Sequence, residues 1–572
     1  MANTPFVYNV KLDYGAVGDG VADDTTEVQA AIDAAAAAGG GIVFFPPGIY
    51  KTGQLALKTR VRLEGAGATL RKFTGAANTF IVNALGTLGT AQALSANANL
   101  NDPTVTVSAT TGLAAGDFVV VRDNTYEFTT PYSGGRNQEI NRILSISGTT
   151  ITLSNRLIGS YATASTAEIV KLNAVVDAAL VGLRLEVPAG VGGTQTRFEY
   201  SYGITVSDCV FVGPSSGDGG AVDFYRSAAC RVTGCKVLDG QNVSLSNNGY
   251  GYTARESSHH IVFDGNHSEN VRENAFSDGT KFSSFINNTC LGSHDSGFNT
   301  HGAGCRHILV QGNIVTGSQS AGIRVGFSGA KAGDFDVQII GNIVRGVRAN
   351  GIAIEGGDQT GGTKNSKRVT VADNQVARFG LGTTAHGIVV IYSEDVEVRG
   401  NRVDGTGSTV GKGILIETQT KRVIVSDNRV QNVTTASSVG IAVTGVGADR
   451  IQVLDNQLIQ CTVNCVWIST NPTNVMLIDN MSDTDNELVQ GTGTVARTRN
   501  VWAGTKDTNS GVASVANGGT ITHGLTAAPT RYGLTATVAG RQVAVTAVSA
   551  TTLTVALTGA VGAENVAWWA EV

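Results

Sequence analysis

The residues with the clearest capacity for chemistry fall in a strand-like segment that recurs through the middle of the chain. His301 is the best candidate for a general acid or base, because the reference pKa of imidazole lies near neutrality. Arg324, one repeat later, carries the charge needed to neutralise a carboxylate while a neighbouring proton is removed, as β-elimination requires. Carboxyl groups accompany them, and the candidate catalytic set is His301, Arg324, Asp278, Asp295 and Glu355.

Polar and aromatic residues around this set are candidates for holding a substrate. Glycines at 279 and 326 leave room for a ligand, and aromatic residues are expected at the rims, where a ring presents an apolar face to a sugar. The candidate substrate-binding residues are Tyr252, Arg255, Lys281, Asn299 and Phe327. The alternative interpretation is a surface ladder of polar groups that satisfy one another, and it stays open beside the catalytic one.

Glycoside hydrolysis is the competing chemistry. It needs two carboxyl groups about 5 Å apart in a retaining enzyme, or about 6.5–9.5 Å apart in an inverting one. Glu355 and Glu417 share a column but lie two coils apart, which separates them by about 10 Å. Asp278 and Asp295 form the other pair, one coil apart. A lyase is therefore slightly favoured over a glycoside hydrolase.

The elements that position these residues are revealed by an asparagine that follows a β-branched strand and recurs at intervals of 22 to 32 residues. A motif at a slightly variable period is typical of a solenoid whose insertions enter loops. Each coil is too small to bury its own apolar face, so the coils must stack. We expect the asparagine at a sharp corner, because it tolerates the left-handed conformation and can pair with its neighbours above and below. The positions are Asn266, Asn288, Asn313, Asn342, Asn374, Asn401, Asn428, Asn456 and Asn480, with Cys209 and Cys235 in the same place upstream.

A second strand repeats in register with the first and presents alternate residues outward. No segment of helical periodicity interrupts the region, and parallel strands joined by crossovers wind right-handed. The sequence therefore predicts an all-β protein built on a right-handed parallel β-helix. One outward column is expected to contain Thr253, Ser277, Asn299, Arg324 and Ala353, and the next Arg255, Gly279, His301, Gly326 and Glu355.

Both ends of the solenoid differ from its middle. Asp24 or Thr25 is expected to cap a helix that runs through Ala38, ends at Gly39 and closes the first coil. Trp568 and Trp569, near the end of the chain, are expected in a core or trimer contact, or as a sugar platform. The predicted organisation is a cap with the first coils at 1–85, an inserted small β-domain at 86–172, the parallel β-helix at 173–480, a linker at 481–510 and a C-terminal β-sandwich at 511–572.

Composition limits the partners. The formal net charge is −5 and 15% of the residues are charged, so the basic excess of a nucleic-acid-binding protein is missing. Seven cysteines without a CxxC pair predict reduced thiols rather than a disulfide framework or a metal site. No motif indicates a cofactor, and a divalent cation such as calcium is compatible with the sequence without being indicated. With no visible signal peptide and no long apolar run, we expect neither a cleaved leader nor membrane insertion.

The segment from Asp13 to Gly53, with the pattern DYGAVGDGVADDT…GGG…PPGIY, closely resembles the opening of the pectate-lyase-like superfamily. That superfamily includes phage tailspikes, mannuronan epimerases and related hydrolases. The resemblance implies the β-helix fold but leaves the reaction open, because one fold serves several chemistries.

A shorter resemblance concerns GFNTHGAG, which begins at Gly297. It is similar to the GFDPHE catalytic segment of mannuronan epimerases in Gly297, Phe298 and His301. Asn299 stands where those enzymes have aspartate, and the proline and glutamate of the segment are also replaced. These departures disfavour epimerase chemistry.

Together these features predict a phage tailspike-like protein that binds and cleaves a bacterial surface polysaccharide (a capsule, exopolysaccharide or O-antigen) in a groove on the β-helix. The resemblance implies a homotrimer in a virion tail or otherwise outside the cell, with other phage tail proteins as further partners. Two alternatives stay open. One is a non-catalytic host-attachment tail fibre of the same fold, and the other is a secreted bacterial polysaccharide lyase or epimerase acting as a monomer.

Overall fold

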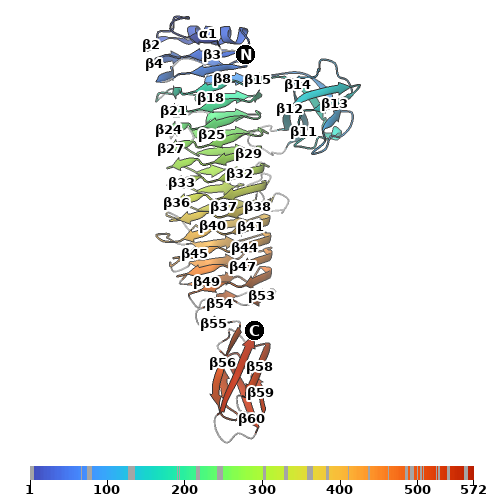
Figure 1. Cartoon of the computed structure of the whole chain (residues 1–572), viewed down its shortest axis with the longest axis vertical. Helices are drawn as coiled ribbons and strands as arrows, with labels where there is room; N and C mark the ends of the chain where they lie inside the picture. The colour runs from blue at the N-terminus through green and yellow to red at the C-terminus, as the bar shows by residue number, and fades with distance from the viewer. Residues whose placement is uncertain are drawn as a thin grey trace. The chain divides into compact units, whose positions relative to one another are not determined.

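The computed structural model divides into two compact units, residues 1–370 and 371–572, each rich in stacked strands (Figure 1). The described residues are 6–65, 67–73, 80–126, 136–189, 191, 193–213, 220–240, 249–300, 304–326, 333–356, 365–381, 385–409, 411–435, 438–461, 463–483, 487–489, 495–498, 500–502, 505–506, 508–523, 525, 528–536, 542–558 and 564–571.

Each coil of unit 1 contributes one strand to each of three parallel sheets, which we call sheets A, B and C. One such coil consists of β26 (Val262–Asp264), β27 (His267–Glu269) and β28 (Ala275–Asp278). Sheet A runs from β1 (Val7–Asn9) to β35 (Phe335–Ile340), and sheet B from β2 (Asp19–Asp23) to β36 (Ile343–Arg345). The predicted parallel β-helix is confirmed.

Sheet C carries most of the candidate site. Its strands in unit 1 are β5 (Leu55–Ala56), β8 (Phe80–Leu85), β18 (Thr194–Glu199), β22 (Gly220–Tyr225), β25 (Tyr250–Arg255), β28, β31 (Phe298–Asn299), β34 (Ile323–Val325) and β37 (Ile352–Glu355). Inward residues stack from coil to coil, as the rings of Phe198 and Phe224 do at 5.3 Å between centroids. Burial of each such side chain contributes about 1.5–3 kcal/mol, and the opposite face is left for polar groups.

A ladder of buried asparagine side chains joins successive coils. The backbone N–H of Asn266 donates to Oδ1 of Asn288 at 3.0 Å, and the same contact at 2.9 Å links Asn288 to Asn313 and Asn313 to Asn342. Nδ2 of each asparagine also donates to a carbonyl of the preceding coil, as Asn313 does to Phe285 at 2.8 Å. Each corner therefore satisfies the buried polar groups of its neighbour.

Two details of this corner differ from the prediction. The left-handed residue is the one before the asparagine, as at Gly265 (φ 63°) and Asn287 (φ 55°), and not the ladder asparagine itself. The ladder asparagines from Asn266 to Asn342 have no positive φ, and the N–H of each one before Asn342 points to the next asparagine along the stack. Upstream, Cys235 does occupy the asparagine position, since its N–H donates to Oδ1 of Asn266 at 2.9 Å.

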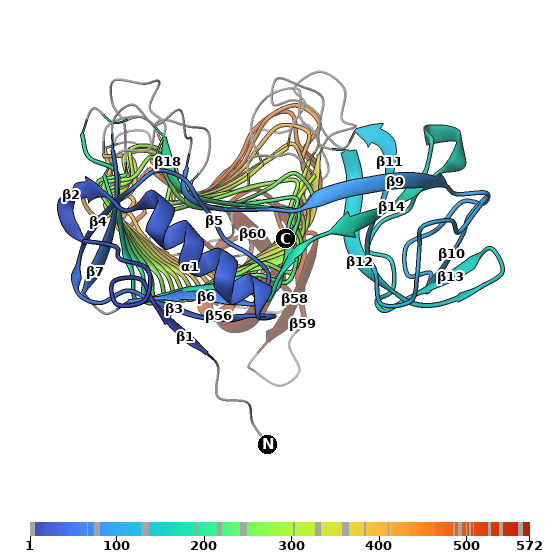
Figure 2. The ribbon, with the colours of Figure 1, turned by 90° about the horizontal axis from the view of Figure 1, so that it is seen from above.

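The first coil of unit 1 is closed by α1 (Thr25–Ala37), which lies across its end (Figure 2). Its inner face buries Val28, Ala31, Ile32 and Ala35. Asp24 is the N-cap residue, but its carboxylate forms no cap bond. It accepts instead from the N–H groups of Val17 and Gly18, at 2.6 and 3.1 Å. The carboxylate of Asp24 thus holds the loop that contains Val17 and Gly18 against the start of α1.

Between β8 and the next coil the chain forms a six-stranded antiparallel sheet, which we call the insert (Figure 2). Its strands, in sheet order, are β10 (Thr104–Thr106), β13 (Thr150–Leu153), β12 (Arg136–Ser147), β11 (Phe118–Tyr126), β14 (Glu168–Asn173) and β9 (Thr87–Ala93). It has its own core, which includes Val119, Ile143 and Tyr161. The loss of coil periodicity in this stretch corresponds to this separate sheet.

Unit 2 contains parallel coils of the same kind, such as β43 (Lys412–Ile416), β44 (Lys421–Ser426) and β45 (Arg429–Gln431). Its asparagine ladder runs past the predicted last rung, because the N–H and Nδ2 of Asn480 donate to Oδ1 of Asn500 at 3.0 and 2.9 Å. β53 (Val495–Thr498) pairs in parallel with β50 (Thr473–Ile478). The expected linker at 481–510 therefore contains a further coil.

The end of the chain forms two three-stranded antiparallel sheets. One contains β56 (Thr508–Val515), β61 (Glu564–Glu571) and β58 (Arg531–Ala536), and the other β57 (Thr520–Thr522), β60 (Thr552–Thr558) and β59 (Gln542–Val548). Trp568 packs in their core, whereas Trp569 is 46% exposed. Among the described residues of the whole chain, no helix is long and apolar enough to span a membrane.

The ladder makes a quantitative prediction. Asn313→Ala removes one rung and leaves buried partners on both neighbouring coils without hydrogen bonds, so the free energy of unfolding should fall by about 2–4 kcal/mol. Urea unfolding followed by circular dichroism measures the change. The matched control is Gln311→Ala, on the same corner but exposed. Equal midpoints for the two variants would contradict a stabilising role for the ladder.

Candidate functional site

A column of polar side chains follows the outer face of sheet C in unit 1. Asp223 pairs in register with Thr253, and Asn299 with Arg324, while Phe276 holds the position between these two pairs. Arg197, one coil before Asp223, donates to its carboxylate. We call Arg197, Asp223, Thr253, Asn299 and Arg324 the polar band.

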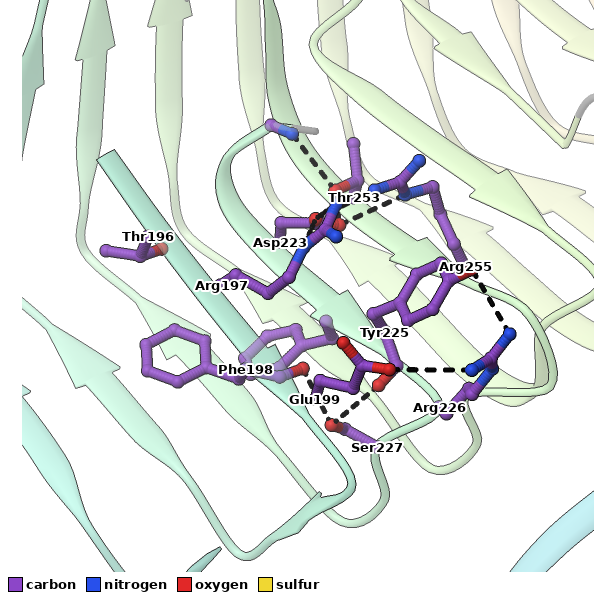
Figure 3. Close-up of polar contacts among 12 residues, drawn as sticks. Thr196, Arg197, Phe198, Glu199, Asp223, Tyr225, Arg226, Ser227, Thr253 and Arg255 are labelled. Carbon is purple, nitrogen blue, oxygen red and sulfur yellow. Dashed lines mark hydrogen bonds and ion pairs between the residues drawn. The ribbon is translucent and has the colours of Figure 1, made fainter. Parts of the chain in front are cut away.

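The N-terminal part of the polar band, on β18, β22 and β25, is centred on the carboxylate of Asp223, which is fully buried (Figure 3). Nε of Arg197 donates to Oδ2 at 2.9 Å, and Arg255 donates to both oxygens at 2.8 and 3.1 Å. Thr253 adds a bond from Oγ1 at 2.6 Å. Burial acts to raise the pKa of Asp223, but the two guanidinium groups outweigh it and the pKa is lowered. The group is therefore a fixed anion.

Three guanidinium groups surround the ring of Tyr225 beside this carboxylate (Figure 3). Those of Arg226, Arg197 and Arg255 lie 4.6, 5.0 and 5.2 Å from the ring centroid. Arg226 pairs with Glu256 at 2.5 Å and with Glu199 at 3.5 Å. Three arginines thus face three carboxylates, Asp223 included, so most of the charge in the cluster is paired within it.

The C-terminal part of the band, on β31 and β34, combines an ion pair with a buried acid. Arg324 donates from Nη2 and Nε to Oε2 of Glu355, at 2.9 and 3.2 Å. Nδ2 of Asn299 donates to Oε1 of Glu273 at 2.9 Å. Glu273 is 2% exposed, and its Oε2 has no hydrogen-bond partner among the described residues. Burial, and then the charge of Asp295, raise the pKa of Glu273 to about 8, so this acid holds its proton at neutral pH.

Several predicted residues do meet on this face. Arg255, Asn299, Arg324 and Glu355 lie on neighbouring coils of sheet C, and their interactions are those described above. Asp295 lies near the same face, where its Oδ2 is 3.9 Å from Nη2 of Arg272. The backbone of Asp278 pairs with that of Arg255, and its side chain is not described. His301 and Phe327 lie outside the described residues.

Two predicted substrate contacts are wrong. Tyr252 points into the solenoid, is 1% exposed and donates from its hydroxyl to the carbonyl of Cys235 at 3.1 Å. Lys281 lies on β29 (Lys281–Ile286) of sheet A, is fully buried, and donates to Oδ1 of Asn137 in the insert at 3.0 Å. Neither side chain can reach a ligand on the outer face of sheet C.

The predicted columns also slip by one residue at β28. Tyr252 pairs with Ala275, so Phe276 takes the place expected for Ser277, and Asp278 the place expected for Gly279. Ser277 instead points inward against Sγ of Cys305 at 3.5 Å. The reason is the period-two alternation of a strand, in which a shift of one residue exchanges the inner and outer faces.

Sequence reasoning missed Arg197, Asp223, Tyr225, Arg226 and Glu273. A signal was present in TRFEY (196–200) and VDFYR (222–226), where charged residues alternate with aromatic ones on successive coils. Opposite charges 26 residues apart, at Arg197 and Asp223, match the coil period. No comparable signal marks Glu273, whose properties come from its burial.

Comparisons with known proteins agree with this architecture. Residues 7–117 match the family described as rhamnogalacturonase A/epimerase, pectate lyase-like, and residues 301–481 match the right handed beta helix region. The Pseudomonas phage phi297 tailspike gp61 has a similar structure, with a TM-score of 0.62 at 15% identity over 99% of both chains. That likeness shows the fold.

Curated relatives match only a short stretch. Mannuronan C5-epimerase AlgE6 of Azotobacter vinelandii is 56% identical over 68 residues, which cover 10% of this chain and 8% of that protein. Alginate lyase 7 of the same organism is 46% identical over 68 residues, again 10% of this chain and 8% of the relative.

The buried acid predicts a pH dependence of stability. Glu273 has a folded-state pKa of about 8 against an ordinary value of 4.5, so it favours folding below about pH 4.5, and this contribution is lost as the pH rises through about 8. Glu273→Gln cannot lose a proton. Between about pH 5 and pH 9 the variant should therefore lose less stability than the unmodified protein, by a few kcal/mol at most.

Thermal unfolding across this pH range measures the effect, with the exposed Glu269→Gln as the control. Parallel pH profiles for the unmodified protein and Glu273→Gln would show that Glu273 ionises normally.

Proposed function

We propose that this protein binds a bacterial surface polysaccharide along the polar band and cleaves it there. The observation that carries the proposal is the band itself, a column of charged and amide side chains held in fixed positions on successive coils. Asp223 and Thr253 are fully buried, so the groups that can meet a ligand are the arginine heads. Coils repeat at about 4.8 Å, which sets these heads at regular distances along an extended chain. Its arginine heads stay partly accessible, with 23% of the Arg197 side chain and 18% of the Arg324 side chain exposed.

The relatives support a carbohydrate ligand. The names of the matched proteins refer to mannuronan and alginate, and the pectate-lyase-like match covers the first part of the chain. We extend this class of substrate to the present chain, and we propose that it acts outside the bacterial cell, in a phage tail. The alternative of a monomeric secreted lyase or epimerase draws on the same relatives.

Two chemistries are open on the band. In β-elimination, His301 would be the base and Arg324 would bind the carboxylate of a uronate. Arg324 already shares its charge with Glu355, so it would have to contact both groups. In hydrolysis, an acid that keeps its proton works beside an ionised carboxylate. Glu273 and Asp295 support this second reading, because the charge of Asp295 helps to hold the proton on Glu273. We retain elimination as slightly favoured and let product analysis decide.

Removal of Arg324 tests the band. Arg324→Ala should lower kcat/KM on a cleaved polysaccharide by about 10²-fold or more, because it removes a charge that meets the substrate in the transition state. Arg345→Ala, an exposed arginine on sheet B, should change it less than about twofold. The measurement is the release of oligosaccharides from a panel of capsules, exopolysaccharides and O-antigens. Equal activity of the two variants would remove the polar band as the active site.

The nature of the products separates the reactions. Ultraviolet absorbance from an unsaturated uronate marks a lyase, whereas new reducing ends without that absorbance mark a hydrolase. Binding to a polysaccharide without either product favours the non-catalytic attachment fibre.

His301 has a test of its own. If it is the general base, His301→Ala should lower kcat by about 10²-fold or more with little change in KM. Activity near that of the unmodified protein would exclude the role.

A homotrimer also remains a proposal. Sedimentation velocity of the full chain should give a trimer, and a clean monomer would contradict the tailspike reading.

A further inference from the structure

A pocket of about 250 Å³ lies where the insert meets the coils of unit 1, and no residue of the polar band lines it. The insert contributes Ile140, Arg156 and Ile158 to its lining, and the coils contribute Tyr202, His259 and His260. Figure 2 shows the insert beside the coils, with β11 and β12 on the side toward them. The volume is below the roughly 300 Å³ at which pockets for drug-sized ligands begin, so it suits a single sugar ring better than a chain.

The walls of this pocket are held together by direct hydrogen bonds. The N–H of Ile140 donates to Nε2 of His259 at 3.0 Å. Nearby, Ser257 donates from Oγ to the carbonyl of Arg136 at 3.0 Å, and Lys281 donates from Nζ to Asn137. The insert is therefore fixed on the coils by partly or fully buried bonds, and the pocket between them is a built feature.

These bonds assign the protons of two histidines. A backbone N–H can only donate, so Nε2 of His259 carries no proton and its hydrogen is on Nδ1. Nδ1 of His259 lies 2.8 Å from Nδ1 of His260, which must then accept. His260 therefore carries its proton on Nε2. Burial lowers the pKa of both rings, which keeps them neutral. The ring of His260 is also stacked on Phe282 at 5.3 Å, so its free N–H has a fixed direction.

The charged groups around the pocket favour an anion. Arg156 donates to the carbonyl of Asn101 at 2.8 Å and has no carboxylate partner among the described residues. The one carboxylate in the lining, Glu139, accepts from the hydroxyl of Tyr161 at 2.8 Å and from the N–H groups of Ile158 and Gly159. Burial raises the pKa of Glu139, which weakens its negative charge at the pocket, and Lys281, outside the lining, acts in the opposite direction. Arg156 is thus the one cation in the lining, and it faces one carboxylate whose acceptors are already engaged.

The remaining lining combines two asparagines, Asn141 and Asn155, with an apolar wall. Asn141 is already engaged, since it donates to Glu139 and to the carbonyl of Asn155 and accepts from the N–H of Asn155. The ring of Tyr202 packs against that of Phe118, with centroids 4.9 Å apart, and Ile140, Ile158 and Ala229 add the other apolar groups of the wall. An apolar wall with a few converging donors is the usual composition of a pocket for a small polar ligand. A pyranose ring offers matching groups, because its C–H face is apolar and its rim is polar.

We propose that this pocket is an accessory binding site for an anionic sugar unit. The carboxylate of a uronic acid contacts the guanidinium of Arg156 and the Nε2–H of His260, and the sugar ring packs on Tyr202 and Ile158. The site would anchor a polymer at the insert while another part of it lies on the coils. Its occupancy does not require that the polar band cleaves a glycan.

The test uses the full chain and small probes. Glucuronic acid, glucose and inorganic phosphate are titrated separately and followed by saturation-transfer NMR and calorimetry. We expect saturable binding of glucuronate, at least about tenfold weaker binding of glucose, and at least about tenfold weaker binding of glucuronate to Arg156→Ala, since a charge-assisted hydrogen bond is lost. Phosphate should bind more weakly than glucuronate, because it leaves the apolar wall uncovered.

Matched variants locate the site. Arg142→Ala removes another arginine of the insert, outside the pocket lining, and should leave glucuronate binding unchanged. Ile158→Trp should fill the pocket and abolish binding without a change in the unfolding temperature. His260→Ala should weaken binding by at least about threefold, as expected for the loss of one neutral hydrogen bond.

The outcomes are decisive either way. No saturable binding of glucuronate, equal affinity for glucose or phosphate, or an unchanged affinity in Arg156→Ala would overturn the proposal. Loss of binding in Arg324→Ala but not in Arg156→Ala would place the sugar on the polar band, and would overturn the accessory site while leaving the proposed function intact. Conversely, Arg156→Ala should keep normal turnover of short fragments, so failure of cleavage and failure of anchoring are measured separately.

Discussion

Parallel pairing between successive coils is the constraint on which the rest of this structure depends. A solenoid coil has no core of its own, and its strands become stable only when the next coil supplies both hydrogen-bond partners and a covering apolar layer. The ladder from Asn266 to Asn342 fixes that pairing at the corner, because each asparagine satisfies buried groups of the coils on both sides. Once a corner is fixed, the register of the adjoining strand follows.

Register in turn decides which side chains can meet. The carboxylate of Asp223 is fully buried, and an isolated charge in that place would be costly. It is tolerated because stacking brings Arg197 from one neighbouring coil and Arg255 from the other to the same oxygens. Buried ion pairs of this kind are weak contributors to net stability, but the loss of one partner is costly. Their effect here is to hold polar groups in a fixed geometry on the outer face of sheet C.

The insert shows what a stacked fold permits. Because each coil contacts only its neighbours, a separate sheet can leave the chain between two coils without disturbing those further along. The insert packs on the coils through a buried apolar cluster that joins Ile140 to Tyr200 and through a few polar bonds. One of these, between Ile140 and His259, also determines the proton positions of a histidine pair. A second polar environment thus forms in unit 1 from residues that are unrelated to the polar band.

The sequence by itself determined the period of the coils, the asparagine positions, the closing helix near Asp24 and the break in pattern that marks the insert. These are local signals, because each depends on residue types within one coil or one helix turn. It also placed Arg255, Asn299, Arg324 and Glu355 on one face, since strand alternation is counted along the chain. Only the tertiary structure decided the rest. The turn before β28 shifts the register by one residue. Lys281 donates a hydrogen bond to Asn137 of the insert, which is far away in sequence. The raised pKa of Glu273 comes from burial and from the charge of Asp295. Desolvation and contacts between distant segments exist only after the coils have stacked, so no local pattern could report them.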